Sequence, residues 1–148
     1  MSLKERLVED AKTALKGKDR VRLGLIRVVR SQIKNAEISK RHELSDEETI
    51  EAVVSVVKAR RESLDYAVKG NRADLVQEAE QELKILEEYL PKQLSEEELL
   101  DIVQHAVRET GAESPKDMGR VMGVIMPQVK GRADGKLINT LVRQSLSG

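Results

Sequence analysis

The sequence contains no cysteine, phenylalanine or tryptophan, and Tyr66 and Tyr89 are its only aromatic residues. Without cysteine there is no disulfide, thiol nucleophile or zinc–thiolate site, a composition that suits a reducing compartment. Stacking of single-stranded bases on aromatic side chains is therefore not expected. No uncharged stretch reaches the roughly 20 residues of a membrane-spanning helix, and the first ten residues lack the apolar core of a secretion signal. We expect a cytoplasmic protein without membrane contact.

What the chain does have is helix signals. Three serines are each followed by glutamate at the capping-box spacing: Ser2, Ser45 and Ser95. Further helix starts are predicted at Asp19, at Asn71, at Ser114 with Pro115, and at Asp134. Helix ends are predicted at Gly17, Lys40, Gly70, Pro91 and Gly111. Pro127 should kink or end the sixth helix. No segment alternates with a period of two, so no sheet is expected.

The predicted fold is all-α, with about seven helices in two packed subdomains. Apolar residues recur at steps of three and four, as in the predicted fourth helix: Leu75, Ala79, Leu83, Leu86 and Leu90. The 148 residues are enough to bury a core without metal or disulfide. We place a long-helix bundle at residues 1–91 and a three-helix subdomain at 92–148, since the short helices follow the segment at Pro91–Leu94.

Charge is balanced overall, with 26 basic and 26 acidic residues, but it is segregated along the chain. Residues 16–41 carry nine Lys or Arg and two acids, whereas residues 74–101 carry ten acids and two lysines. On an ideal helix one basic stripe forms from Arg20, Arg27, Arg30, Lys34 and Arg41. The stripe either faces phosphates, or is a solvated face, or pairs with the acidic fourth helix.

Sequence patterns of catalysis are incomplete in this chain. His42-Glu43 lacks the second histidine of a zinc-protease helix, and His105 is remote in sequence. The stretch from Gly131 to Lys136 is one residue short of a P-loop and has no Ser or Thr after the lysine. The methionines at 118, 122 and 126 indicate core packing more than a peptide groove. We therefore predict no catalytic residue, no metal site and no cofactor.

The C-terminal region carries a recognisable motif in three pieces, DMGRVMG (117–123), MPQVKGRADG (126–135) and LIN (137–139). With it, and with the LPKQL segment at 90–94, the chain resembles the GatB/YqeY family over essentially its whole length. That family includes the tail domain of the B subunit of the glutamine-dependent Asp/Glu-tRNA amidotransferase. The resemblance implies two helical subdomains, a role in holding tRNA, and a family-level association with carbon–nitrogen ligase activity whose chemistry lies elsewhere in the complex.

The motif also has a direct physical interpretation. Gly131 and Gly135 permit a tight turn, Asp134 caps the last helix, and cations project around the turn toward phosphates. The predicted RNA-binding residues are Lys130, Arg132 and Lys136, with Arg120 and Arg143 in support. The alternative is a purely structural turn whose glycines let two helices pack closely.

Three functions remain open at this point. The leading hypothesis is a non-catalytic module that binds tRNA or a tRNA-enzyme complex through backbone electrostatics and shape. The second is a protein-interaction adaptor that docks a partner through the acidic fourth and fifth helices or the methionine-bearing sixth. The third is a stand-alone amide-transfer enzyme, for which the sequence offers no active site.

Overall fold

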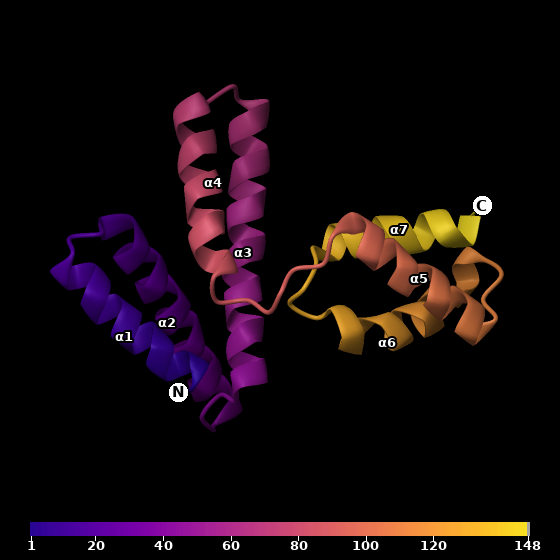
Figure 1. Cartoon of the computed structure of the whole chain (residues 1–148), viewed down its shortest axis with the longest axis horizontal. Helices are drawn as coiled ribbons and strands as arrows, with labels where there is room; N and C mark the ends of the chain where they lie inside the picture. Colours follow the sequence, from indigo (N-terminus) through magenta and orange to yellow (C-terminus); the bar gives the residue numbers. More distant parts are fainter. Residues whose placement is uncertain (148) are drawn as a thin grey trace. The chain divides into compact units, whose positions relative to one another are not determined.

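The computed structural model describes residues 1–147, which form seven α-helices, one short 3-10 helix and no strand. The bounds are α1 Leu3–Lys16, α2 Arg20–Lys40, α3 Asp46–Lys69, α4 Ala73–Glu87, α5 Glu96–Thr110, η1 Pro115–Asp117, α6 Met118–Val129 and α7 Gly135–Ser147. The all-α prediction is confirmed. Two compact units divide the chain between Leu90 and Pro91 (Figure 1).

Local capping explains where most helices begin. In α1, α3 and α5 the serine hydroxyl accepts from the amide of the glutamate three residues later, and that glutamate accepts from the serine amide. Each reciprocal pair satisfies two amides that a helix N-terminus leaves without partners. Asp19 caps α2 by accepting from the Arg22 amide at 3.1 Å. The predicted starts at these four positions are confirmed.

One local prediction needs correction. Asn71 does not cap α4: it has φ 53° in the turn, and Arg72 precedes the helix instead. Leu75, the first of the apolar periodic residues of α4, is 41% exposed. Pro127 lies inside α6, which continues to Val129. Proline removes only one helical hydrogen bond there, and the helix stops within a turn.

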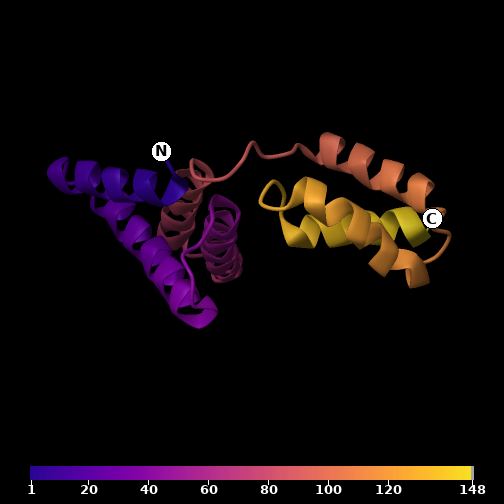
Figure 2. The same cartoon turned by 90° about the horizontal axis from the view of Figure 1, so that it is seen from below.

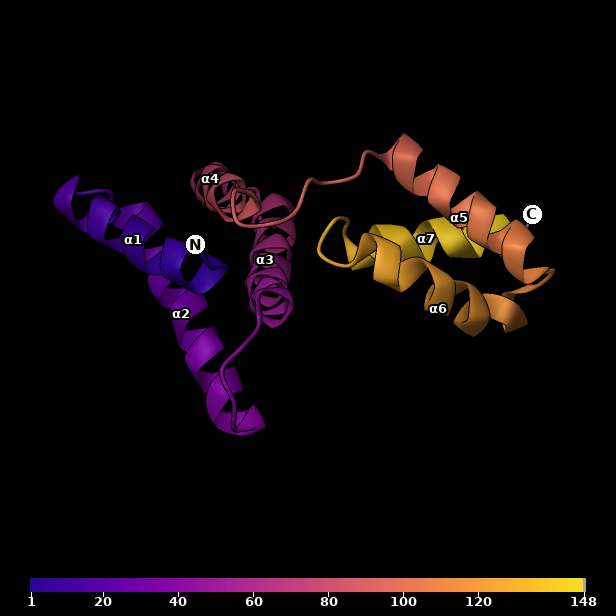
Figure 3. The ribbon, with the colours of Figure 1, turned by 60° about the horizontal axis from the view of Figure 1, so that its bottom comes forward.

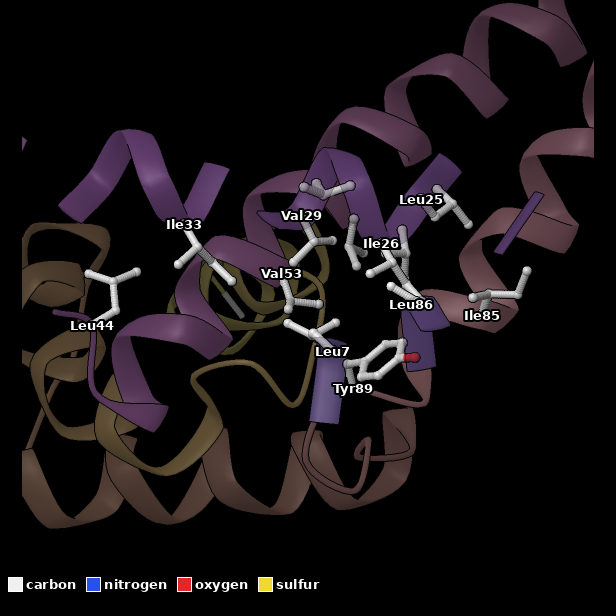
Figure 4. Close-up of a cluster of buried hydrophobic side chains, with 13 residues drawn as sticks. Leu7, Leu25, Ile26, Val29, Ile33, Leu44, Val53, Ile85, Leu86 and Tyr89 are labelled. Atoms are coloured by element: carbon white, nitrogen blue, oxygen red, sulfur yellow. The ribbon is translucent and has the colours of Figure 1, made fainter. Parts of the chain in front are cut away.

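The first unit, Met1–Leu90, packs two helical hairpins against each other. Figure 1 shows α1 beside α2 and α3 beside α4, and Figure 3 shows the same helices from another side. The core between them is drawn in Figure 4, and it contains Leu7, Leu25, Ile26, Val29, Ile33, Leu44, Val53, Ile85, Leu86 and Tyr89. Tyr89 fastens the end of α4 to α1, because its hydroxyl donates to Asp10 Oδ2 at 2.6 Å. Burial and this carboxylate raise the pKa of Tyr89 to about 12.

The second unit begins at Pro91 and contains α5, α6 and α7, which all contact one another (Figure 2). Its core contains Leu99, Val103, Ala106, Val121, Ile125, Val129, Ile138, Leu141, Val142 and Leu146. Met118 and Met122 pack against this core, whereas Met126 is 39% exposed. Packing against the core thus uses Met118 and Met122 more than Met126, and docking of a partner on the sixth helix stays a prediction.

Candidate nucleic-acid interface

The motif turn between α6 and α7 is built by backbone geometry. Gly131 is buried and has φ 74°, a conformation that costs an L-residue roughly 1–2 kcal/mol. Asp134 caps α7, since its Oδ1 accepts from the Lys136 amide at 3.1 Å and its carbonyl from the Ile138 amide at 3.0 Å. The structure gives Gly135 no such constraint: it is the first residue of α7, and an added Cβ would meet nothing within 4 Å.

Arg132 is turned inward onto its own unit. Its Nε donates to the Lys92 carbonyl at 3.1 Å and its Nη1 to the Gln128 carbonyl at 3.3 Å. Its own carbonyl accepts from the Leu94 amide at 2.8 Å. The guanidinium therefore closes the turn against the preceding segment and does not project toward solvent as a free cation.

Gln93 takes part in the same closure; the sequence showed it only as part of the LPKQL segment of the family resemblance and gave it no role. Its amide nitrogen donates to the Gly131 carbonyl at 2.7 Å and to the Pro91 carbonyl at 3.0 Å. Only the folded chain brings Gln93 and Gly131 together, because they are 38 positions apart in the sequence. The LPKQL segment is thus a structural partner of the motif.

The remaining motif cations are not equivalent. Arg120 is held by Asp117 at 2.8 Å and by the Thr110 carbonyl at 3.3 Å. The two exposed lysines, Lys130 and Lys136, have interactions of their own within the chain. Arg143 is exposed on α7, and its guanidinium has no hydrogen bond or ion pair among residues 1–147. The motif does not bring its five cations together as one open cluster.

The basic stripe on α2 is different. Arg20, Arg27, Arg30 and Lys34 are exposed, and within the described part of the chain none of them forms an ion pair or a side-chain hydrogen bond. We call these four residues the α2 basic stripe. Arg41 is also exposed, but α2 ends at Lys40 and Arg41 has φ 60°, so it does not continue the helical stripe.

Two carboxylates on or beside α2, Glu37 and Glu88, already bind other cations. Glu88 binds Arg22 through two hydrogen bonds of 2.9 and 3.2 Å, and Glu37 binds Lys4 at 2.5 Å. The second pair raises the pKa of Lys4 and lowers that of Glu37. The interpretation that the stripe pairs with the acidic fourth helix is therefore wrong for these four residues, although Arg22 reaches Glu88 at the end of that helix. Two apolar residues of α2, Val21 and Val28, are also exposed, by 38% and 39%.

Residues 1–147 contain neither a group of metal ligands nor a helix that could span a membrane. Within residues 1–147, no three His, Asp or Glu side chains are grouped as metal ligands. His42 and His105 are exposed, each with a nitrogen 3.7 Å from one glutamate. No helix in this part of the chain combines the length and apolarity that crossing a membrane requires.

These features define a class: an all-α protein of two small helical units, with an open cationic helix face in the first and a closed, glycine-containing turn in the second. Comparison with known proteins then gives the family. Residues 4–146 match the Yqey-like protein family, so this chain belongs to it. The resemblance inferred from the motif is confirmed.

Two kinds of relatives are similar to this chain. "Altered inheritance of mitochondria protein 41, mitochondrial" of Pyrenophora tritici-repentis is 27% identical over 94% of this chain and 78% of its own length. The Kluyveromyces lactis protein of the same name is 35% identical over 80% and 66%. The E subunit of the Thermococcus gammatolerans Glutamyl-tRNA(Gln) amidotransferase is 42% identical over 57 residues, which are 36% of this chain and 9% of that protein. The family relation to amidotransferase subunits is thereby supported, and the cytoplasmic location stays a prediction.

Proposed function

We propose that this protein is a non-catalytic helical module that binds tRNA, or a tRNA-bearing enzyme complex, through the α2 basic stripe. The observation that carries the proposal is that four exposed cations on one helix have no anionic partner among the described residues. A partial relative acts, by its name, on Glu-tRNA(Gln). The contact surface proposed here differs from the motif turn, because Arg120 and Arg132 are engaged within their own unit.

In the unbound protein the cations of the stripe repel one another and destabilise α2, and a bound polyanion would remove this repulsion. Arg27 and Arg30 are three residues apart and Arg30 and Lys34 four apart, so like charges are neighbours on the helix surface. Such pairs destabilise a helix by roughly 0.2–0.5 kcal/mol each. Arg20 adds a cation to the first helical turn, where the macrodipole disfavours positive charge. Phosphates bound along α2 would reverse the sign of all these terms.

The test is a titration of purified protein with bulk tRNA, followed by fluorescence anisotropy at two or more salt concentrations. R27E/K34E should weaken binding at least about tenfold and lower the slope of log affinity against log salt by about two, one for each cation removed. The matched control is K58E/K84E, which makes the same change in net charge at two exposed lysines on α3 and α4. It should bind nearly as the unaltered protein does.

Two results would overturn the proposal. One is no tRNA binding by the unaltered protein at low salt. The other is loss of binding in K130E/K136E with R27E/K34E unaffected, which would assign the interface to the motif turn. Partners captured from lysate that persist after nuclease treatment would instead favour the protein-interaction adaptor.

A further inference from the structure

A groove of about 660 Å³ lies in the first unit between α1 and α2, beside the α2 basic stripe. Its volume falls within the range of about 300–1,000 Å³ typical of small-molecule sites. Cations, one carboxylate and apolar side chains all line it. The groove is thus a more specific feature than a charged surface, because it offers three kinds of contact within one small volume.

The cationic wall comes from α2. Arg27, Arg30 and Lys34 line the groove, and none of them has an ion pair or side-chain hydrogen bond among residues 1–147. They span two helical turns, about 10 Å along the axis. Their long side chains allow two guanidinium groups and an ammonium to converge on one phosphate group, and arginine binds phosphate oxygens through paired hydrogen bonds.

A carboxylate also lines the groove: Glu37 lies two turns after Arg30 on the same face of α2, where Lys4 of α1 reaches it. Lys4 donates to Glu37 Oε2 at 2.5 Å, and the Leu44 amide donates to the same oxygen at 2.9 Å. The other oxygen, Oε1, has no hydrogen bond within the described residues. Because Lys4 lowers the pKa of Glu37, this carboxylate is ionised at neutral pH. Oε1 can therefore accept a hydrogen bond from a hydroxyl or amino group of a ligand.

The groove also has an apolar lining. Ile33 is 5% exposed and belongs to the core, and Val8 from α1 completes the apolar part. A flat hydrophobic group can rest on this lining within reach of the cations and of Glu37. Phosphate contacts, an apolar contact and a carboxylate acceptor together match the parts of a phosphorylated nucleoside.

We propose that this groove binds a phosphorylated nucleoside, with its phosphate on Arg27, Arg30 and Lys34. Its base packs on Val8 and Ile33, and Glu37 accepts from a hydroxyl or an exocyclic amino group. The ligand is either a free nucleotide or one nucleotide of a bound RNA. The second source rests on the proposed function and the first does not.

Isothermal titration with AMP, adenosine and inorganic phosphate tests the groove directly. AMP should bind more tightly than either adenosine or phosphate, because only AMP makes all three kinds of contact. R30Q should weaken AMP binding about tenfold or more. The matched control is R20Q, which removes one cation of the same stripe outside the groove and should change AMP binding less than about twofold.

Three results would overturn the proposal that the groove binds a phosphorylated nucleoside. They are no binding of AMP, phosphate binding as tightly as AMP, or equal losses in R20Q and R30Q, which would show a diffuse charge effect. Competition between AMP and tRNA would identify an RNA nucleotide as the ligand. AMP binding sensitive to R30Q, without any tRNA binding, would support a free nucleotide and defeat only the proposed function.

Discussion

The α2 basic stripe and the motif turn both contain arginine and lysine, but the side chains differ in their partners. In the turn, Arg132 donates to two backbone carbonyls, and near the start of α6 Arg120 donates to a carbonyl and a carboxylate. On α2, Arg27 and Lys34 have no such acceptors within residues 1–147. The difference follows from the local backbone more than from the residues themselves.

Turns and helix ends leave carbonyl groups without helical partners, and an arginine nearby can satisfy several of them. In the middle of a helix every carbonyl already accepts from the amide four residues on. A cation there can reach only side chains, and the nearby acids Glu37 and Glu88 are taken by Lys4 and Arg22. The position of a cation along the backbone thus decides whether it binds a carbonyl and stabilises the fold or remains available to a ligand.

The largest expected effect is a difference in stability between substitutions of Arg132 in the turn and of Arg27 in the stripe. Arg132→Gln should lower the free energy of unfolding of the second unit by about 2 kcal/mol, because two charge-assisted hydrogen bonds are lost. Arg27→Gln should leave stability within about 0.5 kcal/mol, since it removes no contact. Urea denaturation followed by circular dichroism measures both. Equal losses of stability in the two variants would contradict the idea that Arg132 has a structural role that Arg27 lacks.

A similar contrast holds for two glycines. Gly131→Ala should destabilise the second unit by roughly 1–2 kcal/mol, because alanine must adopt φ 74°. The shift of the thermal midpoint measures this loss. Gly135→Ala serves as the control in the same turn, since its added Cβ would meet nothing within 4 Å. If both variants melt together, the left-handed backbone at Gly131 is not what fixes the turn.

Gly24 lies on the exposed side of α2, and replacing it with alanine should raise stability, whereas replacing Gly131 should lower it. An added Cβ would meet nothing within 4 Å, and the residue lies inside a helix. Gly24→Ala should therefore stabilise the first unit by about 0.5–1 kcal/mol. The same thermal melts report it. A lowered midpoint would mean that α2 is less regular than described.

The smallest effect concerns acid stability and compares two capping glutamates. Hydrogen bonds from the Ser45 amide and from Lys40 lower the pKa of Glu48 to about 2 from an ordinary 4.5. The pKa of Glu98 is also lowered, by hydrogen bonds with Ser95, but no lysine donates to it among the described residues. Because a lowered folded pKa favours the ionised folded state, the stabilisation from Glu48 is complete above pH 4.5 and is lost as pH falls toward 2.

Glu48→Gln should therefore flatten the loss of stability between pH 4.5 and 2 more than Glu98→Gln does. Denaturation midpoints at a series of pH values measure the two slopes. A steeper acid dependence in E48Q than in the unaltered protein would reverse the sign and reject this account of Glu48.

The sequence by itself determined the helices, because caps and apolar periodicity act over three or four neighbouring residues. The Ser45–Glu48 box and the Asp134 cap are of this kind, and the motif was enough to identify the family. The prediction that Asn71 caps α4 was wrong, because asparagine suits a left-handed turn as well as a helix cap. Which of the two forms depends on how α3 and α4 meet.

Only the tertiary structure decided what each cation does. Arg132 and Arg27 are chemically the same, and their sequence neighbourhoods do not reveal that one meets the Lys92 carbonyl and the other lines a groove with Glu37. Hydrogen bonds and cavities join residues tens of positions apart, so they form only when helices pack. Local sequence signals carry no information about such distant partners.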